Sequence, residues 1–354
     1  MEEINKLIDE GFLLHEQPWK LNDLAFMSLK IALKAYFSTY QTMKYSLHIF
    51  NDEHGNKSID INHWPEYSIA CSETIVHFQH FTELIIKDLL RKKHELLALD
   101  ASKEHDLFYR LLQGEQIKPI DYEKLKSVEF SLALERLCEL LKKGRLDKEQ
   151  LDFILQAKEW LFKLSNLRNR LWHRGSYILR YNALDQFVGK WILPFLLNVF
   201  SLPDYIDNER FWKYGILSCG IDPIQEIISH FKSCDKYNIG KIAFLKELAR
   251  ASFENPLTTK SNGYSDNQHR AEKMAEIESD SPRGNRIETC PVCGTRSLIV
   301  FDDFEVDGPN SDGVYKIASR FNWEVKCSCC SFTINQFLEN PSDYSYGFIE
   351  DFWK

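Results

Sequence analysis

Residues 148–175 read KEQLDFILQAKEWLFKLSNLRNRLWHRG, and this stretch decides the fold class. Apolar residues recur in it every three or four positions, which is the period of an amphipathic α-helix. Asp147 with Gln150 is a variant of the capping box at its start, and Gly175 supplies a stop at its end. The same period predicts further helices at 21–49, 66–98, 121–143, 178–201, 222–232 and 240–252. Long helices with short connections predict a mainly α protein built on an up-and-down helical bundle.

The composition changes after the last of these helices. Residues 254–288 are polar with few apolar anchors, which predicts a linker with room for one short helical turn. Two β-type runs follow it, at 297–301 and 314–325. The predicted order is an N-terminal helical extension, a helical bundle, additional helices, a polar linker and a small β-rich module, at residues 1–60, 61–203, 204–253, 254–288 and 289–354.

Charge and apolar runs limit the possible partners and compartment. The formal charge of −8 provides no overall basic field, so a contact with nucleic acid would need a local patch. The N-terminus is acidic where a signal peptide would be basic. The apolar run at 191–200 is about half the ~20 residues that a membrane-spanning helix needs, and Pro194 interrupts it. Isolated cysteines such as Cys71 and Cys138 do not resemble a disulfide framework. We therefore expect a cytoplasmic protein with no membrane partner.

Two cysteine pairs lie in the β-rich module. Cys290 and Cys293 form the first pair, Cys327 and Cys330 form the second, and 33 residues separate the pairs. A gap of two residues lets both thiolates of a tight turn reach one ion, and this segment resembles a zinc ribbon with an acidic hairpin insertion. Cys329 is an alternative fourth ligand. Four thiolates leave no open coordination position, which predicts structural Zn²⁺ and not a catalytic ion. Unrelated thiols or redox-active pairs are the other interpretations.

The end of the helix at 148–174 carries an unusual charge. Arg168 falls within the apolar stripe, where a guanidinium is costly unless it meets a carboxylate or a phosphate. Asn169 and His173 are four residues apart and share a face. Arg168 and His173 are five apart, about 140° around an ideal helix, so one helix is expected to hold them together poorly. Either the helix unwinds before His173, or two chains bring Arg and His together at a dimer interface.

Residues 168–173, RNRLWH, resemble the motif of HEPN-domain ribonucleases, in which an arginine and a polar residue precede a histidine after a variable spacer. Residues 77–90, HFQHFTELIIKDLL, also resemble the family's first core helix, which often carries a Glu and a Lys one turn apart. These are Glu83 and Lys87 here. The resemblance covers about residues 66–200 and implies a HEPN-like helical bundle.

The resemblance implies a metal-independent endoribonuclease that acts on RNA as a homodimer. The 2′-hydroxyl would attack the adjacent phosphate and give a 2′,3′-cyclic phosphate. His173 would be the general acid or base, Arg168 would stabilise the charge on phosphorus, and Asn169 would orient the histidine or the phosphate. Glu83 and Lys87 would support the site. The family is common among bacterial toxins and anti-phage effectors, so an antitoxin or a defence-system partner is a further implication.

Other interpretations remain open at the level of sequence. Arg168 and His173 can form a pair that caps helix carbonyls, and Glu83 with Lys87 can be an exposed i,i+4 ion pair. His77 and His80 lie near acidic residues on one helix, but no second helix offers a matching metal-binding pair. The protein could instead be a non-catalytic HEPN-like dimerisation module whose ribbon recognises nucleic acid or a protein. A zinc-dependent hydrolase acting at the cysteines is the third reading.

Overall fold

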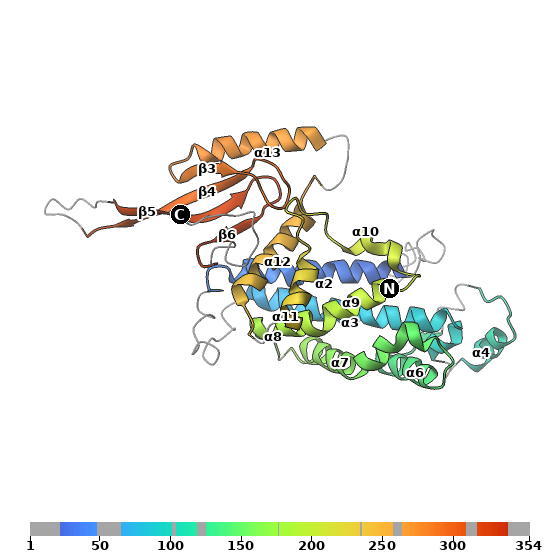
Figure 1. The fold of residues 1–354 in the computed structure, drawn as a ribbon. Helices are drawn as coiled ribbons and strands as arrows, with labels where there is room; N and C mark the ends of the chain where they lie inside the picture. Colours follow the sequence, from blue (N-terminus) through green and yellow to red (C-terminus); the bar gives the residue numbers. More distant parts are fainter. Residues whose placement is uncertain are drawn as a thin grey trace, which may run out of the picture. The chain divides into compact units, whose positions relative to one another are not determined.

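A computed structural model describes residues 22–47, 65–100, 104–118, 125–175, 177–233, 236–257, 264–308 and 317–338. These residues are mostly helical, and a four-stranded antiparallel sheet lies near the C-terminus (Figure 1). The chain divides into two compact units. The first unit takes Met1–Ala32, Ser72–Tyr177 and Phe195–Trp212, and the second takes Leu33–Cys71, Ile178–Pro194 and Lys213–Lys354. The long helices α2 (Asn22–Met43) and α3 (Pro65–Arg91) contribute residues to both units.

The first unit is a helical bundle. Its elements, beside parts of α2 and α3, are α4 (His105–Leu112), α6 (Phe130–Lys142), α7 (Lys148–Trp172), most of α9 (Leu193–Phe200) and α10 (Glu209–Trp212). The helices α6 and α7 pack side by side (Figure 1). A short antiparallel pair, β1 (Leu99–Asp100) with β2 (Lys126–Ser127), precedes α6. The Asp147 side chain accepts a hydrogen bond from the Gln150 amide, so the predicted start of α7 is confirmed.

Aromatic rings form the centre of the first unit. The ring of Phe200 on α9 stacks on that of Trp212 with centroids 4.1 Å apart. Phe26 on α2 and Phe81 on α3 also contact the ring of Phe200, and both are fully buried. Such rings bury a large apolar area and prefer offset or tilted pairings, so this cluster fixes four helices against one another.

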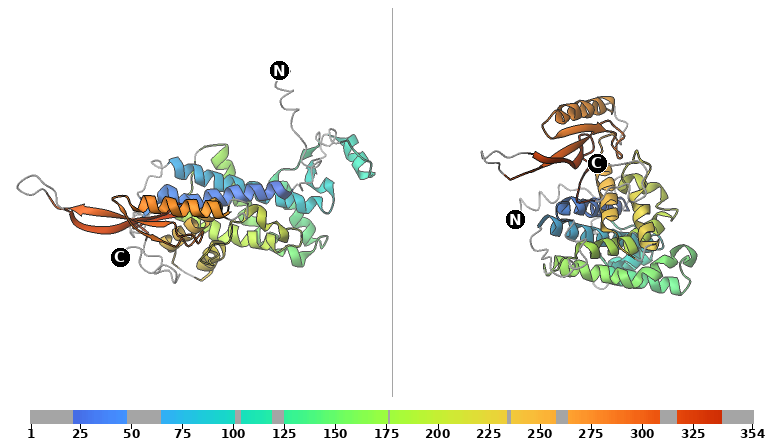
Figure 2. Two further views of the ribbon diagram at one scale, coloured as in Figure 1. Left: turned by 90° about the horizontal axis from the view of Figure 1, so that it is seen from above. Right: turned by 60° about the vertical axis from the view of Figure 1, so that its left-hand side comes forward.

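The second unit combines helices with the sheet. Its helical elements are α8 (Tyr181–Phe187), a π-helical turn at Val188–Ile192, α11 (Pro223–Ser233), α12 (Ile239–Glu254) and α13 (Tyr264–Ser279). The sheet has the order β3 (Gly284–Glu288), β4 (Leu298–Val306), β5 (Ile317–Cys327) and β6 (Thr333–Asn335), with every neighbouring pair antiparallel. Helix α13 lies along β3 and β4 (Figure 2). Most of α12 is buried, including polar positions, which makes it the central helix of this unit.

Hydrogen bonds attach the sheet to α12. The carboxylate of Glu247, fully buried on α12, accepts from the amide of Thr333 in β6 at 2.7 Å and from Nε2 of Gln41 on α2 at 2.6 Å. Arg250, one turn later on α12, binds the same carboxylate and donates to the carbonyl of Ser331 at 2.6 Å. The sheet is therefore anchored by a buried carboxylate whose oxygens are both hydrogen-bonded.

The prediction of a mainly α chain with a small β-rich module is confirmed, but several details differ. Helix α3 ends at Arg91, and α6 begins only at Phe130. The expectation for residues 254–288 is wrong, because α13 is a 16-residue helix and β3 follows it. Its buried face rests on Ala271 and Ala275, and alanines give only a weak apolar signal in the sequence.

The two units do not follow the five predicted segments. Helix α2, which falls in the predicted N-terminal extension, supplies buried residues to both units. The sheet shares a unit with the helices predicted as additional. None of the helices in the described ranges has the length and apolar character that crossing a membrane requires.

Candidate functional site

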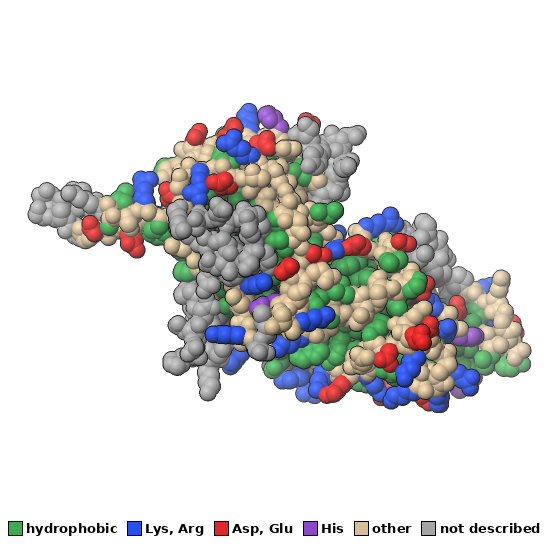
Figure 3. Space-filling model, viewed as in Figure 1, with side chains coloured by type: hydrophobic (Ala, Val, Ile, Leu, Met, Phe, Trp, Pro, Cys, Tyr) green, Lys and Arg blue, Asp and Glu red, His purple; other side chains and the backbone are tan. Residues whose placement is uncertain are grey.

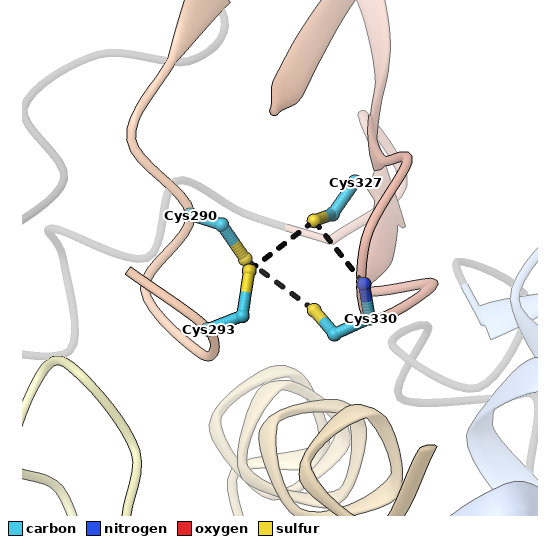
Figure 4. Close-up of side chains that lie close together, drawn as sticks. All are labelled: Cys290, Cys293, Cys327 and Cys330. Carbon is cyan, nitrogen blue, oxygen red and sulfur yellow. Dashed lines mark hydrogen bonds between the residues drawn. The ribbon is translucent and has the colours of Figure 1, made fainter. Parts of the chain in front are cut away.

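The four predicted cysteine ligands come together at the end of the sheet. Cys290 and Cys293 lie in the turn after β3, while Cys327 ends β5 and Cys330 lies in the turn before β6. All four sulfur atoms lie within 4.8 Å of one another and point toward a common centre (Figure 4). The Sγ atoms of Cys290 and Cys330 are 3.5 Å apart, and those of Cys293 and Cys327 are 3.6 Å apart. The thiol of Cys329 does not belong to this group.

These distances fit one tetrahedral ion. With Zn–S bonds of about 2.3 Å, the sulfur atoms of a tetrahedral site are about 3.8 Å apart, close to the spacing observed here. The backbone amides of Cys329 and Cys330 point at Sγ of Cys327, at 3.4 and 3.5 Å, and Oγ of Ser297 lies 3.2 Å from it. Such donors stabilise thiolates that bind a metal. The cluster can therefore hold a metal ion, and its thiols occupy all four positions.

The turn that carries the first cysteine pair is held by its backbone. Gly294 has a φ of +76°, which an L side chain rarely adopts, and its amide donates to the carbonyl of Cys290. The amide of Ser218 donates to the carbonyl of Val292, and that of Cys219 donates to the carbonyl of Pro291. The turn that carries Cys290 and Cys293 is therefore part of the second unit's packed structure and not an isolated loop.

The second candidate cluster lies at the C-terminal end of α7, in the first unit. Nη1 of Arg168 lies 3.0 Å from Nε2 of His173 and donates to Oδ1 of Asn169 at 3.1 Å. Since a guanidinium can only donate, Nε2 of His173 accepts, and the imidazole is neutral in this arrangement. Nε of Arg168 is buried without a hydrogen-bond partner, and no carboxylate among the described residues forms an ion pair with this guanidinium.

One chain brings Arg168 and His173 together, which corrects the expectation from helix geometry. Helix α7 ends at Trp172, and His173 follows as its C-cap with φ −89° and ψ −26°. The Cα–Cβ bonds of the two residues point in different directions around the helix axis. The arginine side chain is long enough for its guanidinium to reach the imidazole of His173. Arg168 is half-buried and not within the core, which explains how a guanidinium is tolerated in this stripe.

Glu83 and Lys87 form the predicted pair on α3 in the first unit. Nζ of Lys87 lies 2.6 Å from Oε1 of Glu83, and Nε2 of Gln79 donates to the other oxygen at 3.1 Å. The burial of the carboxyl group opposes ionisation, but the hydrogen bond and charge of Lys87 lower the pKa of Glu83 below its usual value. Lys87 is only 7% exposed, so the interpretation as an exposed surface pair is wrong.

The sequence reasoning gave His80 no role in proton transfer. Its Nδ1 lies 2.6 Å from Oγ of Ser28 on α2, and the side chain remains exposed. Partial desolvation lowers the pKa of His80, and the charges of Lys87 and Arg168 lower it further against the opposing effect of Glu83. His80 lies three residues before Glu83 on α3.

The sequence reasoning also missed a buried ion pair in the second unit. Nζ of Lys246 on α12 lies 2.7 Å from Oδ1 of Asp185 on α8, and both side chains are fully buried. Tyr237 donates to the other carboxylate oxygen at 2.6 Å, and the ammonium lies 3.9 Å from the ring centroid of Tyr181. Burial lowers the pKa of Lys246, and Asp185 opposes this shift. The pair lies in the core, so we assign it to stability.

The surface of the first unit carries both signs of charge. Figure 3 shows Lys and Arg side chains interspersed with Asp and Glu along the edge where α6 and α7 lie. Several are exposed i,i+4 pairs, such as Lys143 with Glu139 and Lys163 with Glu159. Chemically, the α7 cluster offers a guanidinium without a carboxylate partner, an amide and a neutral imidazole.

No protein-family model, no curated protein and no solved structure matches this chain.

Proposed function

We propose that this protein is a metal-independent endoribonuclease whose site is Arg168, Asn169 and His173, and that Zn²⁺ at the four cysteines is structural. The observation that carries the proposal is the contact of 3.0 Å between Nη1 of Arg168 and Nε2 of His173, made by a guanidinium that lacks a carboxylate partner among the described residues. A guanidinium in this state is suited to an anionic phosphodiester, which it can bind through two parallel hydrogen bonds.

The roles follow from the chemistry of each group. Arg168 would donate to the non-bridging oxygens and stabilise the charge that builds on them as phosphorus becomes five-coordinate. Because phosphate competes for the guanidinium, Nε2 of His173 becomes free for proton transfer when substrate binds. Asn169 would hold Arg168 in place through its Oδ1 atom. The products would be a 2′,3′-cyclic phosphate and a 5′-hydroxyl, with no metal ion in the reaction.

The homodimer implied by the HEPN resemblance would place two such clusters at one cleft. A single chain already joins Arg168 with His173, so dimerisation would complete the substrate groove and not the pair itself. The cysteine cluster would have no part in bond cleavage, because four thiolates leave no position for water or substrate. Its role is to fix the end of the sheet that α12 anchors.

The test compares RNA cleavage by the full chain and its variants in excess EDTA. Arg168→Ala should lower the rate by about 10²–10³-fold, and His173→Ala by about 10²–10⁴-fold. Lys163→Ala is the matched control, since it removes an exposed cation from the same helix and should cut at the wild-type rate. RNA fragments should end in a cyclic phosphate, and all-deoxy substrate should stay intact.

Two outcomes would separate the alternatives. If wild type and both variants leave a broad set of RNAs intact, the enzyme proposal is refuted and a non-catalytic module remains. If cutting disappears with loss of bound zinc in Cys327→Ser while Arg168→Ala stays active, the cysteine cluster carries the chemistry instead.

A further inference from the structure

The last turn of α7 carries a large aromatic side chain that faces water. Trp172, the final residue of the helix, is 65% exposed, and no other aromatic side chain in the described ranges is as exposed. Tryptophan is usually buried over most of its surface, because its ring has a large apolar area that folding removes from water. The preceding residue, Leu171, is buried, so the backbone of this turn is anchored while the indole projects from it.

Trp172 shares a face of α7 with the proposed site. It follows Arg168 by four residues and Asn169 by three, and residues at these spacings on a helix have Cβ atoms about 5–6 Å apart. The amide of His173 donates to the carbonyl of Asn169 at 3.0 Å, so the turn that contains Trp172 is closed by a hydrogen bond. Nη1 of Arg168 meets Nε2 of His173 across the same turn. Backbone geometry therefore places the indole beside the pair that would hold the phosphate.

The end of α7 is also basic. Arg168, Arg170 and Arg174 lie near it, and no carboxylate of the described residues forms an ion pair with them. This patch is local, since the whole chain carries a formal charge of −8. A basic patch with an exposed aromatic ring is suited to single-stranded nucleic acid, because the cations hold the backbone while the ring stacks on a base.

Tyr177 is the other aromatic residue near this helix end, and one face of its ring is covered. The guanidinium carbon of Arg170 lies 3.8 Å from the centroid of that ring. Such a cation–π contact ties the chain that follows the helix back to α7. Tyr177 is also less exposed than Trp172. Trp172 is therefore the better placed of the two rings to receive a base.

We propose that Trp172 stacks on an unpaired base next to the cleaved phosphate, so that the substrate is single-stranded RNA, an inference that rests on the proposed function. Base and phosphate are joined through one ribose, so a phosphate on Arg168 brings a neighbouring base to the indole one turn away. A base within a duplex already stacks on its neighbours, and an unpaired base can turn toward a side chain. Trp172 thus selects the substrate and takes no part in proton transfer.

A second copy of the chain is the other partner that an exposed tryptophan suggests. In a two-fold interface the same patch meets itself, so the arginines at this helix end would face those of the other chain. Like charges placed opposite one another cost affinity, whereas the phosphates of RNA neutralise them. Charge therefore favours RNA as the occupant of this surface.

The first experiment measures Trp172→Ala in the full chain, in excess EDTA, on a single-stranded deoxyribose oligonucleotide with one ribose. KM should rise about 5–150-fold, as for a lost stack between a base and an aromatic side chain, and kcat should stay unchanged. Trp172→Phe should recover part of the loss, because phenylalanine keeps a ring. Tyr109→Ala is the matched control, since it removes an exposed ring from α4 of the same unit and should cut at the wild-type rate.

The second experiment removes the base instead of the ring. An abasic ribose or deoxyribose is placed in turn on the 5′ and the 3′ side of the cleaved phosphate. At one of the two positions it should raise the KM of the wild type by the same factor as Trp172→Ala, and it should raise the KM of Trp172→Ala no further. If the loss is equal in wild type and variant at both positions, no base stacks on Trp172, and the inference is overturned while the proposed function stands.

Three other results would also overturn the inference. They are an unchanged KM in Trp172→Ala, a fully paired duplex that is cut as fast as the single strand, and a smaller sedimenting species for Trp172→Ala, which would assign the ring to a contact between copies. A wild type that cuts no faster than Arg168→Ala refutes the proposed function instead. The dissociation constant of an all-deoxy single strand then decides on Trp172 alone, because equal binding by wild type and Trp172→Ala excludes the stack.

Discussion

The buried pair of Lys246 and Asp185 allows a quantitative prediction about stability. Lys246→Met keeps the length of the side chain and removes its charge, so the carboxylate of Asp185 stays in the core. It loses the partner at 2.7 Å and keeps the hydroxyl of Tyr237 at 2.6 Å. Removing one partner of a buried ion pair costs about 3–5 kcal/mol, because the other charge remains without compensation. The ring of Tyr181, which lies under the ammonium, also loses its cation–π contact.

This cost converts into a large thermal shift. For a unit of 150–250 residues, each kcal/mol lost lowers the midpoint temperature of thermal unfolding by about 2–4 °C. This midpoint should therefore fall by about 6–20 °C for the second unit. Far-ultraviolet circular dichroism during heating measures it, with urea unfolding as a check. The exposed pair of Lys163 with Glu159 supplies the control, since Lys163→Met should leave the midpoint unchanged.

A double variant separates charge from packing. Asp185→Leu combined with Lys246→Met removes both charges, and it should recover most of the lost stability because apolar replacements of buried pairs are often neutral. If Lys246→Met unfolds at the same midpoint as the Lys163→Met control, the reasoning about an uncompensated core charge is refuted. A double variant no more stable than Lys246→Met would place the loss in packing.

Three further outcomes are expected. Wild-type protein should contain one zinc ion per chain by mass spectrometry, and Cys327→Ser should contain none and unfold at lower temperature, because a structural site adds its binding energy to folding. The free energy of unfolding should fall as the pH drops below 6.5, because the pKa of His80 is lowered in the folded chain and the unfolded chain takes up the proton first. His80→Gln should reduce that slope by a fraction of the ~1.4 kcal/mol per pH unit of one fully coupled proton, since the ring is exposed. Glu247→Gln should lower the free energy of unfolding in denaturant by about 1–3 kcal/mol, because an amide replaces the buried carboxylate that accepts from the amide of Thr333. An unchanged denaturant midpoint would show that other contacts hold the sheet.

Local patterns allowed part of the structure to be predicted from the chain alone. The gap of two residues in each cysteine pair places two thiols in one turn, and the observed cluster contains the four predicted residues. The start of α7 followed from Asp147, and its end from Gly175, whose φ of +59° only glycine adopts easily. These features depend on residues close in sequence, so their spacing carries the information.

Other features depend on partners that are far apart in the sequence. Ser28 and His80 are 52 positions apart, and Asp185 and Lys246 are 61 apart. No periodicity identifies such a partner, because helical spacing tells which face a residue occupies and not what the face meets. Helix α13 was missed for a related reason. Its two buried alanines form a helix face that packs on the sheet, and the sequence does not show which surface they contact.

The sequence by itself therefore determined the helical class, the four thiols of the cysteine cluster and the helix end that carries Arg168 and His173. Only the tertiary structure decided that this arginine reaches the histidine of its own chain. The angle between two positions of an ideal helix gives the directions of their Cα–Cβ bonds, and it does not include the length of the side chains. It alone also placed Oγ of Ser28 on α2 within 2.6 Å of Nδ1 of His80 on α3, since such a contact depends on which helices pack together.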